Sequence, residues 1–259
     1  MRVETNQKLV DRNRQIAQTL VFFSFAFLIG IFFLANLPLF SPQTQIDMTL
    51  YSILPWLILP LGFIPTLISA RMTNLWIRRP RPELVIREGL KGLSNKSVLY
   101  NYFHFPSRHV LICPQGVFAI VTRYQDGNFS VNGDQWKTNI PLFSRLLRVM
   151  RSEQIGNPTN DAITAAAHVK KLIAPIAPDV EVQPLIVFVN PRVQLEIADP
   201  VVPVVFPYDN MEPNLKDFLR EGKNTKKLAN NDLLALVNAF EEATLPKAAK
   251  AKAKVNQSA

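Results

Sequence analysis

The sequence has few of the residues that build disulfide frameworks and zinc sites. Its 259 residues include one cysteine, Cys113, and three histidines. A single cysteine excludes an intrachain disulfide, and this composition cannot make a zinc site of the usual Cys/His kind. The cysteine content therefore gives no indication of an oxidising compartment.

Charged residues are absent from two long stretches near the N-terminus. The first runs from Gln15 to Ile46 and the second from Met48 to Ala70, and both are mostly apolar. A helix rises about 1.5 Å per residue, so about 20 apolar residues can cross the core of a bilayer. We therefore predict two N-terminal transmembrane helices, over residues 16–40 and 48–70, joined by an external loop over residues 41–47.

The second stretch contains three regularly spaced prolines, Pro55, Pro60 and Pro65. A proline removes a backbone donor and kinks a helix, so we predict that this span is kinked. The alternative for this stretch is a re-entrant or interfacial segment. For the first stretch the alternative is a cleaved signal peptide, which is disfavoured because no small-residue cleavage site precedes LPLFSPQ.

Lysine and arginine flank the two stretches but are absent from the loop between them. Residues 1–15 hold four basic residues and residues 71–82 hold four, whereas residues 41–47 hold none. The positive-inside rule then predicts a cytoplasmic N-terminus over residues 1–15, a basic juxtamembrane linker over residues 71–82, and a cytoplasmic C-terminus. The predicted protein is a multi-pass protein of the cell membrane, and its expected partners are the lipid bilayer and anionic lipid head groups.

The net charge of +9 lies outside residues 92–246. Residues 92–246 carry 15 basic and 15 acidic residues. This part therefore lacks the broad excess of positive charge that is typical of nucleic-acid-binding domains. The Lys/Ala-rich residues 246–259 are predicted to form a disordered tail.

Between residues 83 and 245 the pattern is that of an α/β domain. Strands are predicted over residues 98–105, 109–113, 117–124 and 128–131, which together form an antiparallel meander, and Asn132-Gly133 is typical of a tight hairpin. Apolar runs over residues 182–190 and 201–207 are typical of buried strands. Helical patterns occupy residues 83–93, 141–152, 161–175, 215–223 and 230–245.

Several short motifs in this domain occur in a characteristic order. They are ELVIREGLKGL (83–93), HVLICPQGVFAIVTR (109–123), QDG (125–127), NGDQW (132–136), GNPTNDA (156–162) and VQPLIVFVN (182–190). The ordered set resembles the nuclease-related domain (NERD) family, whose members are related to the PD-(D/E)XK restriction-endonuclease fold. The resemblance covers about residues 83–245. The fold class that we expect is thus α/β: two transmembrane helices, then a restriction-endonuclease-like domain with a mixed central sheet.

The resemblance implies a catalytic site that this sequence does not complete. Such nucleases use clustered carboxylates to hold a hard divalent cation, usually Mg²⁺, which activates water. By the resemblance, the family's Asp falls on Arg108, its Glu on Val121, its Lys on Arg123 and its Gln on Asp161, while Glu83 matches the acid of the first helix. An arginine repels a cation and a valine cannot coordinate one, so we expect no catalytic residues, no metal and no other cofactor.

An alternative is that the remaining acids, Glu83, Asp126 and Asp161, have moved together to form a Mg²⁺ site. The protein would then be an active metal-dependent nuclease. Asp161 has a simpler explanation, because acidic residues are favoured at the start of a helix. No nucleophile–His–acid arrangement is visible around His109.

Two sets of arginines are candidates for binding an anion. Arg108 and Arg123 would give a positive charge to the cleft that holds the catalytic site in the family, unless they pair with local acids such as Asp126. Arg145, Arg148 and Arg151 fall on one face of a predicted helix and could contact phosphate or lipid head groups, unless that face is merely solvated. We therefore expect a catalytically inactive, membrane-anchored cytoplasmic module that binds or scaffolds, with a nucleic acid or another anion as a possible ligand.

Overall fold

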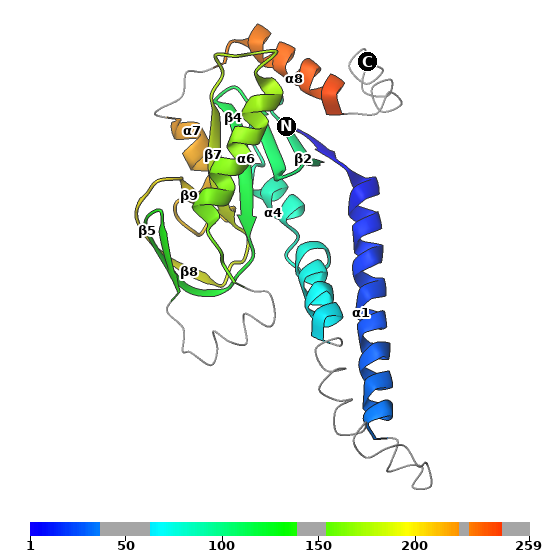
Figure 1. The fold of residues 1–259 in the computed structure, drawn as a ribbon. Coiled ribbons are helices and arrows are strands. Elements are labelled where there is room, and N and C mark those ends of the chain that lie inside the picture. Colours follow the sequence, from blue (N-terminus) through cyan, green and yellow to red (C-terminus); the bar gives the residue numbers. More distant parts are fainter. Residues whose placement is uncertain (37–62, 139–153, 223–227, 245–259) are drawn as a thin grey trace. The chain divides into compact units, whose positions relative to one another are not determined.

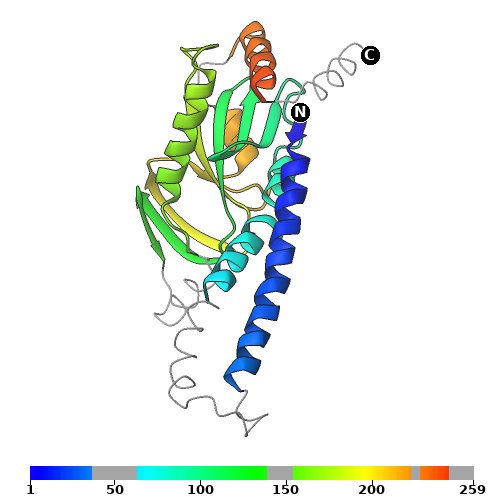
Figure 2. The same cartoon turned by 45° about the vertical axis from the view of Figure 1, so that its right-hand side comes forward.

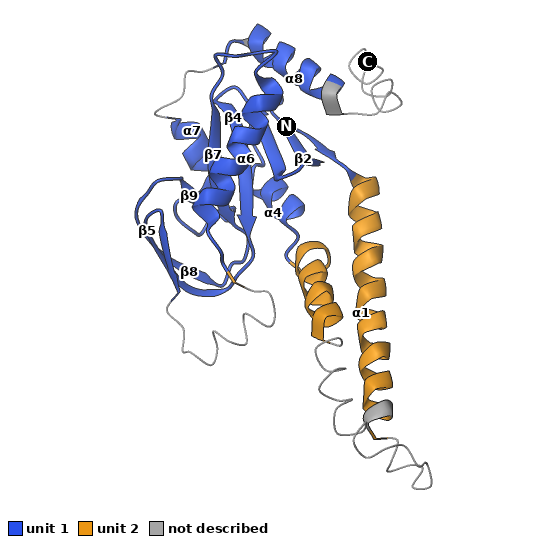
Figure 3. Cartoon of the chain, in the orientation of Figure 1, with its two compact units in different colours: residues 1–6, 80–140, 155–259 blue, residues 7–79, 141–154 orange. Residues whose placement is uncertain are grey.

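The computed structural model describes residues 1–36, 63–138, 154–222 and 228–244 of the chain. These residues divide into two compact units (Figure 3). Unit 1 comprises residues 1–6, 80–140 and 155–259, and unit 2 comprises residues 7–79 and 141–154. The predicted features outside the described residues are residues 37–40 of the first span, the loop over 41–47, residues 48–62 of the second span, the helix over 141–152, and the tail.

Unit 1 is built around a six-stranded mixed sheet, which confirms the predicted α/β class. The strands lie in the order β1, β2, β3, β4, β7, β9. The pairs β2–β3 and β3–β4 are antiparallel, and the remaining neighbours are parallel. The bounds are β1 (Arg2–Thr5), β2 (Val98–His104), β3 (Ser107–Cys113), β4 (Gly116–Arg123), β7 (Val182–Phe188) and β9 (Val204–Val205).

The predicted meander is correct up to β4 and wrong beyond it. Strand β5 (Gly127–Gly133) leaves the central sheet and forms a second sheet with β6 (Gln135–Thr138) and β8 (Val193–Pro200). Packing decides this, because Phe129 of β5 joins a buried cluster with Phe188 instead of extending the first sheet. The predicted Asn-Gly hairpin is confirmed, since β5 and β6 pair antiparallel across it. Strand β8 was not predicted.

Helices cover both faces of the central sheet (Figures 1 and 2). Along β4, Phe118 and Ile120 join one buried cluster, whereas Val117 and Ala119 join another. This alternation is the two-residue period of a strand. The first cluster also contains residues of α4 (Pro82–Gly89) and α7 (Leu215–Glu221), and the second contains residues of α6 (Pro158–Ile173) and α8 (Asn230–Thr244). We call these the α4 face and the α6 face.

The N-terminal residues form an edge strand that the sequence analysis did not predict. Strand β1 runs parallel to β2, with Arg2 opposite Val98 and Thr5 opposite Asn101. Arg2 forms an ion pair with Glu241 of α8, and the Asn101 side-chain amide donates to Thr5 Oγ1 over 3.0 Å. A four-residue segment is too short to show a periodic pattern, so only these distant partners identify it as a strand.

Unit 2 contains one long apolar helix, α1 (Gln7–Ala35). It begins at Gln7 rather than at residue 16, because the polar residues before the apolar run continue the same helix. Among the described residues, its segment Gln7–Phe33 is the one helix long and apolar enough to cross a membrane. Many of its large apolar side chains are exposed: Phe22, Phe23, Phe25, Leu28, Ile29, Phe32 and Phe33.

A second helix in unit 2, over residues 63–76, packs antiparallel to α1. Arg14 Nε donates to the Trp76 carbonyl oxygen over 3.2 Å, and Ser24 Oγ donates to the Pro65 carbonyl oxygen over 3.3 Å. The earlier position in α1 thus contacts the end of the second helix, and the later position contacts its beginning, so the two helices are antiparallel. The Arg14 guanidinium also satisfies a carbonyl at a helix C-terminus, where the last four carbonyls lack helical partners. Residues 63–70 belong to the predicted second span, and they are helical.

Candidate functional site

The positions that replace the expected nuclease residues gather at one end of the central sheet. Arg108 lies near the start of β3, while Val121 and Arg123 lie at the end of the antiparallel neighbour β4. Val121 packs against the apolar cluster of the α6 face, and by the alternation of β4 Arg123 points to the same face. Arg108, Val121 and Arg123 thus lie in one region of the fold.

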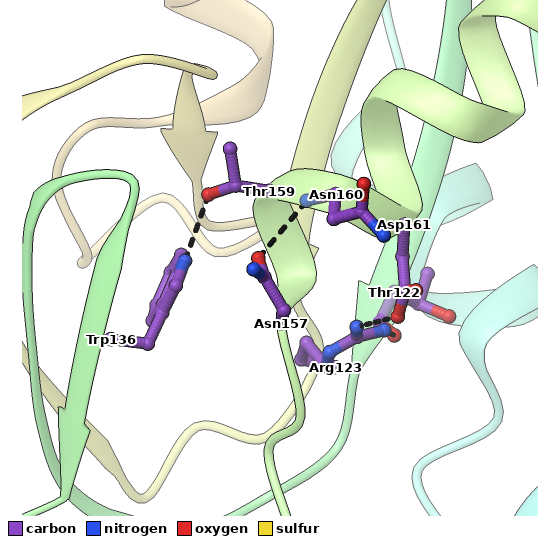
Figure 4. A network of polar contacts seen from close by, with 7 residues as sticks. All are labelled: Thr122, Arg123, Trp136, Asn157, Thr159, Asn160 and Asp161. Atoms are coloured by element: carbon purple, nitrogen blue, oxygen red, sulfur yellow. Dashed lines mark hydrogen bonds and ion pairs between the residues drawn. The ribbon is translucent and has the colours of Figure 1, made fainter.

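Arg123 forms an ion pair with Asp161 in the first turn of α6 (Figure 4). The Arg123 side chain is 12% exposed and that of Asp161 is 56% exposed. Burial lowers the pKa of Arg123, and the Asp161 carboxylate opposes that shift. The guanidinium also donates to the Thr122 carbonyl oxygen over 3.2 Å. The structure thus pairs the residue at the family's Lys position with the residue at its Gln position.

The start of α6 is held in place by two further contacts (Figure 4). Asn157 caps the helix, its side-chain oxygen accepting a hydrogen bond from the Asn160 backbone N–H over 3.0 Å. Trp136 Nε1 of β6 donates to the Thr159 hydroxyl over 2.8 Å. Sequence reasoning did not assign Trp136 or Asn157 to the site, although both lie in the motifs NGDQW and GNPTNDA that carried the resemblance. The second sheet and the helix cap together fix the position of Asp161.

Glu83 lies apart from these residues, on the α4 face. Its carboxyl is buried and accepts a hydrogen bond from the Tyr102 hydroxyl over 2.9 Å. The Tyr102 ring packs edge-on against His109, with ring centroids 5.0 Å apart. His109 shares the side of β3 that Leu111 and Cys113 occupy, and those two residues belong to the cluster of the α4 face. The sheet therefore separates Glu83 from the Arg123–Asp161 pair.

Asp126 has yet another partner. Its carboxylate lies 3.7 Å from Arg192, whose side chain is largely exposed. The alternative that the arginines pair with local acids holds for Arg123, whose partner is Asp161. In the part of the chain that the structure describes, no group of three or more His, Cys, Asp or Glu side chains could hold a metal ion. Glu83, Asp126 and Asp161 thus do not make a ligand set for a hard cation.

His109 forms a buried polar contact that sequence reasoning missed. Its Nδ1 lies 2.8 Å from Asn101 Oδ1, and the same asparagine donates to Thr5 of β1. Burial, with a smaller contribution from the adjacent Arg108, lowers the pKa of His109 to about 3. A neutral ring must then donate through Nδ1, which leaves Nε2 buried and without a hydrogen-bond partner among the described residues. The asparagine and the histidine lie opposite each other on β2 and β3, a pairing that no local pattern shows.

The remaining candidate residues, Arg145, Arg148 and Arg151, lie outside the described residues. The proposed basic helix face therefore stays a prediction.

The fold and the site define an α/β domain with a mixed central sheet, in which a helix N-terminus is joined by an ion pair to the end of a central strand. Residues 83–189 match the family model of the nuclease-related domain, NERD. The restriction-endonuclease-like fold is consistent with that family. No curated protein and no solved structure matches the chain.

The Tyr102–Glu83 contact supports a stability prediction. Replacing Tyr102 by Phe removes a donor to a buried carboxylate, and we expect a loss of about 1–3 kcal/mol in the free energy of unfolding. Tyr208→Phe is the matched control, because the Tyr208 hydroxyl donates to a neutral acceptor, the Val189 carbonyl oxygen, over 2.6 Å. Chemical unfolding of the full chain in detergent measures both. A Tyr102→Phe loss no larger than that of Tyr208→Phe would contradict the assignment.

Proposed function

We propose that the protein is a membrane-anchored cytoplasmic module that has lost nuclease activity and acts by binding or scaffolding. The nuclease-related domain indicates a nuclease-related function. The observation that carries the further step is the ion pair between Arg123 and Asp161. Both groups stand where the resemblance expects parts of a catalytic site, and each is engaged with the other.

The loss of activity follows from the chemistry of three positions. Val121 offers no ligand atom where the resemblance expects a carboxylate. Arg108 brings a positive charge where the resemblance expects a second carboxylate, and a cation would be repelled there. Asp161 is the ion-pair partner of Arg123, and moving it to a metal would leave a guanidinium that is 12% exposed without this partner.

A ligand of the module would be an anion that competes with Asp161 for Arg123. The Asp161 side chain is more than half exposed, so the carboxylate can turn away while a phosphate takes its place. Arg108, at the same end of the sheet, adds to the positive charge of the site. The predicted basic face of Arg145, Arg148 and Arg151 would extend this surface to a nucleic acid or to lipid head groups.

Membrane anchoring is supported by the chain path through unit 1. Strand β1 precedes α1, whereas its partner β2 follows residues 63–76, and both strands belong to one sheet. Strands of one sheet lie on the same side of a membrane. The chain between residues 6 and 80 must therefore cross the membrane an even number of times if it crosses at all. Two spans, running in opposite directions as α1 and residues 63–76 do, meet this requirement.

The same strand argues against a cleaved leader. Cleavage after the apolar helix would remove β1, together with its ion pair to Glu241 and its hydrogen bond from Asn101. The edge of β2 would then lose its neighbour, and edge strands with unpaired backbone groups promote aggregation. We therefore propose a multi-pass protein of the cell membrane, with both termini on the cytoplasmic side and anionic lipid head groups near the basic residues 71–82.

The proposal is tested on the full chain in detergent or lipid discs. We expect no cleavage of single- or double-stranded DNA or RNA, and no saturable heat of Mg²⁺ or Mn²⁺ binding in calorimetric titration. The matched comparison restores the family pattern in one variant, R108D/V121E/R123K/D161Q. Because the fold is retained, we expect this variant to bind metal where the natural sequence does not.

The alternative is an active metal-dependent nuclease with relocated acids. It is favoured if the natural protein cleaves nucleic acid and Glu83→Gln abolishes the cleavage. Nucleic-acid binding without cleavage is a separate outcome. It would show an affinity that falls steeply with salt, with a smaller slope when Arg145, Arg148 and Arg151 are replaced by Ala.

A further inference from the structure

The strands of the central sheet give unit 1 two distinct ends. Strands β1, β2, β4 and β7 all run in the same direction, because β2 and β4 are both antiparallel to β3 and the other pairs are parallel. Their last residues thus define one end of the unit, which we call the carboxyl end. The Arg123–Asp161 pair and the β2–β3 turn at residues 105–106 lie there.

The chain leaves and re-enters unit 1 at the carboxyl end. On leaving, Asn6 donates from its backbone N–H to the Asn101 carbonyl oxygen over 3.0 Å and from its side chain to the Tyr102 carbonyl oxygen over 3.3 Å. On re-entry, Glu83 accepts from the Tyr102 hydroxyl. Both points therefore contact Tyr102 of β2, and the first also contacts Asn101. The 73 residues between them, from Gln7 to Arg79, include the apolar helix α1.

The carboxyl end exposes apolar side chains near two half-buried arginines. Phe105, in the β2–β3 turn, is 44% exposed, and Leu84, next to Glu83, is 40% exposed. Arg81 precedes α4, and Arg108 follows the turn. Single exposed apolar residues are ordinary on a protein surface. These two differ because they flank the points where the chain passes to an apolar helix.

We infer that the carboxyl end of unit 1 is a lipid-contacting surface, in which Phe105 and Leu84 enter the head-group boundary and Arg81 and Arg108 contact lipid phosphates. The inference rests on the proposed membrane anchoring. The chain leaves and re-enters unit 1 at the carboxyl end, so this end, and not the opposite one, would lie next to the bilayer. Apolar residues flanked by arginines suit an interface where acyl chains meet anionic head groups. A ligand of the Arg123–Asp161 site would then be a group presented at the membrane surface.

The experiment labels single positions of the full chain with an environment-sensitive fluorophore. The natural cysteine, Cys113, is fully buried, so the label goes to the introduced residue in Phe105→Cys or, independently, in Leu84→Cys. The matched control is Ile176→Cys. Ile176 is 38% exposed, and it follows the end of α6, close to the first residues of β7 at the opposite end. The proteins are placed in lipid discs with brominated acyl chains, with and without an anionic lipid.

We expect quenching at residues 105 and 84 to exceed that at residue 176 by at least about two-fold, since interfacial groups lie roughly 5–10 Å into the boundary. Anionic lipid should increase the difference. Equal quenching at the three positions, in protein that floats with vesicles after an alkaline wash, would overturn the inference and leave the anchoring intact. Protein that fails to float would overturn both.

Discussion

The protein loses stability as the pH falls from 6.5 to 5, by roughly 1–2 kcal/mol, because His109 stays neutral in the folded state. Burial lowers its pKa to about 3 in the folded protein, whereas an unfolded histidine takes up a proton near pH 6.5. Between these values the unfolded state binds more protons, so acid favours unfolding. At pH values well above 6.5 the ring is neutral in both states and this dependence vanishes.

His104 adds to the effect in the same direction. Burial, with a smaller contribution from His168, lowers its pKa to about 4. The ring of His104 packs edge-on against Phe240 of α8, with centroids 4.7 Å apart, so its protonation places a charge beside an apolar ring in the core of the α6 face. Above pH 5 the histidines of the unfolded state take up protons, whereas ordinary carboxylates take up protons at lower pH. The stability change in this pH range therefore reports on the histidines.

The measurement is chemical unfolding of the full chain in detergent, followed by tryptophan fluorescence at pH values from 5 to 8. His109→Gln keeps a side-chain amide donor for Asn101 but cannot titrate, so we expect a flatter dependence on pH. His168→Gln is the comparison, because His168 is only half-buried. An unchanged slope in His109→Gln would show that His109 does not carry the dependence.

Asp161→Ala lowers the free energy of unfolding by about 1–3 kcal/mol. The change leaves the Arg123 guanidinium, 12% exposed, without its carboxylate. Breaking a buried pair costs about 3–5 kcal/mol, and the half-exposed position of Asp161 reduces that figure through solvent screening. The same change removes an acid from the first turn of α6, which adds a few tenths of a kcal/mol.

Asp126→Ala provides the control for Asp161→Ala. Its partner, Arg192, is 77% exposed and 3.7 Å away, so we expect a loss below about 1 kcal/mol. The double variant Arg123→Met/Asp161→Ala tests the mechanism further. It removes both charges, and we expect it to recover part of the stability that Asp161→Ala loses. Equal losses for Asp161→Ala and Asp126→Ala would contradict a structural role for the pair.

Local patterns predicted the parts of the fold that depend on near neighbours. The alternation and turn residues of β2, β3 and β4 identified three strands of the central sheet, and Asn132-Gly133 identified the hairpin between β5 and β6. The pattern of α4 was also sufficient, because its apolar spacing and the proline at its start are local signals. Strand β8 was missed although Val193, Leu195 and Ile197 alternate with polar residues, which is the two-residue period of a half-buried strand.

The sequence predicted which residues belong to the candidate site, but not how they contact one another or on which face of the sheet they lie. The ordered motifs placed Arg108, Val121, Arg123 and Asp161 in one region, and the structure brings Arg123 and Asp161 into contact. No pattern indicated that Glu83 would lie on the other face of the sheet. The reason is that the choice of face depends on how α4 and α6 pack, and both helices have apolar stripes that fit either side.

The sequence by itself determined the uncharged apolar stretch of α1, the neutral balance of residues 92–246, and the replacement of expected carboxylates by Arg108 and Val121. These are properties of composition and order. Only the tertiary structure decided that residues 2–5 join the edge of β2, that Asp161 pairs with Arg123, and that His109 is buried against Asn101. The first two are contacts between residues distant in the chain, which form because packing the sheet between its helices brings the partners together. Asn101 and His109 are eight residues apart, and the register of β2 against β3 places them opposite each other.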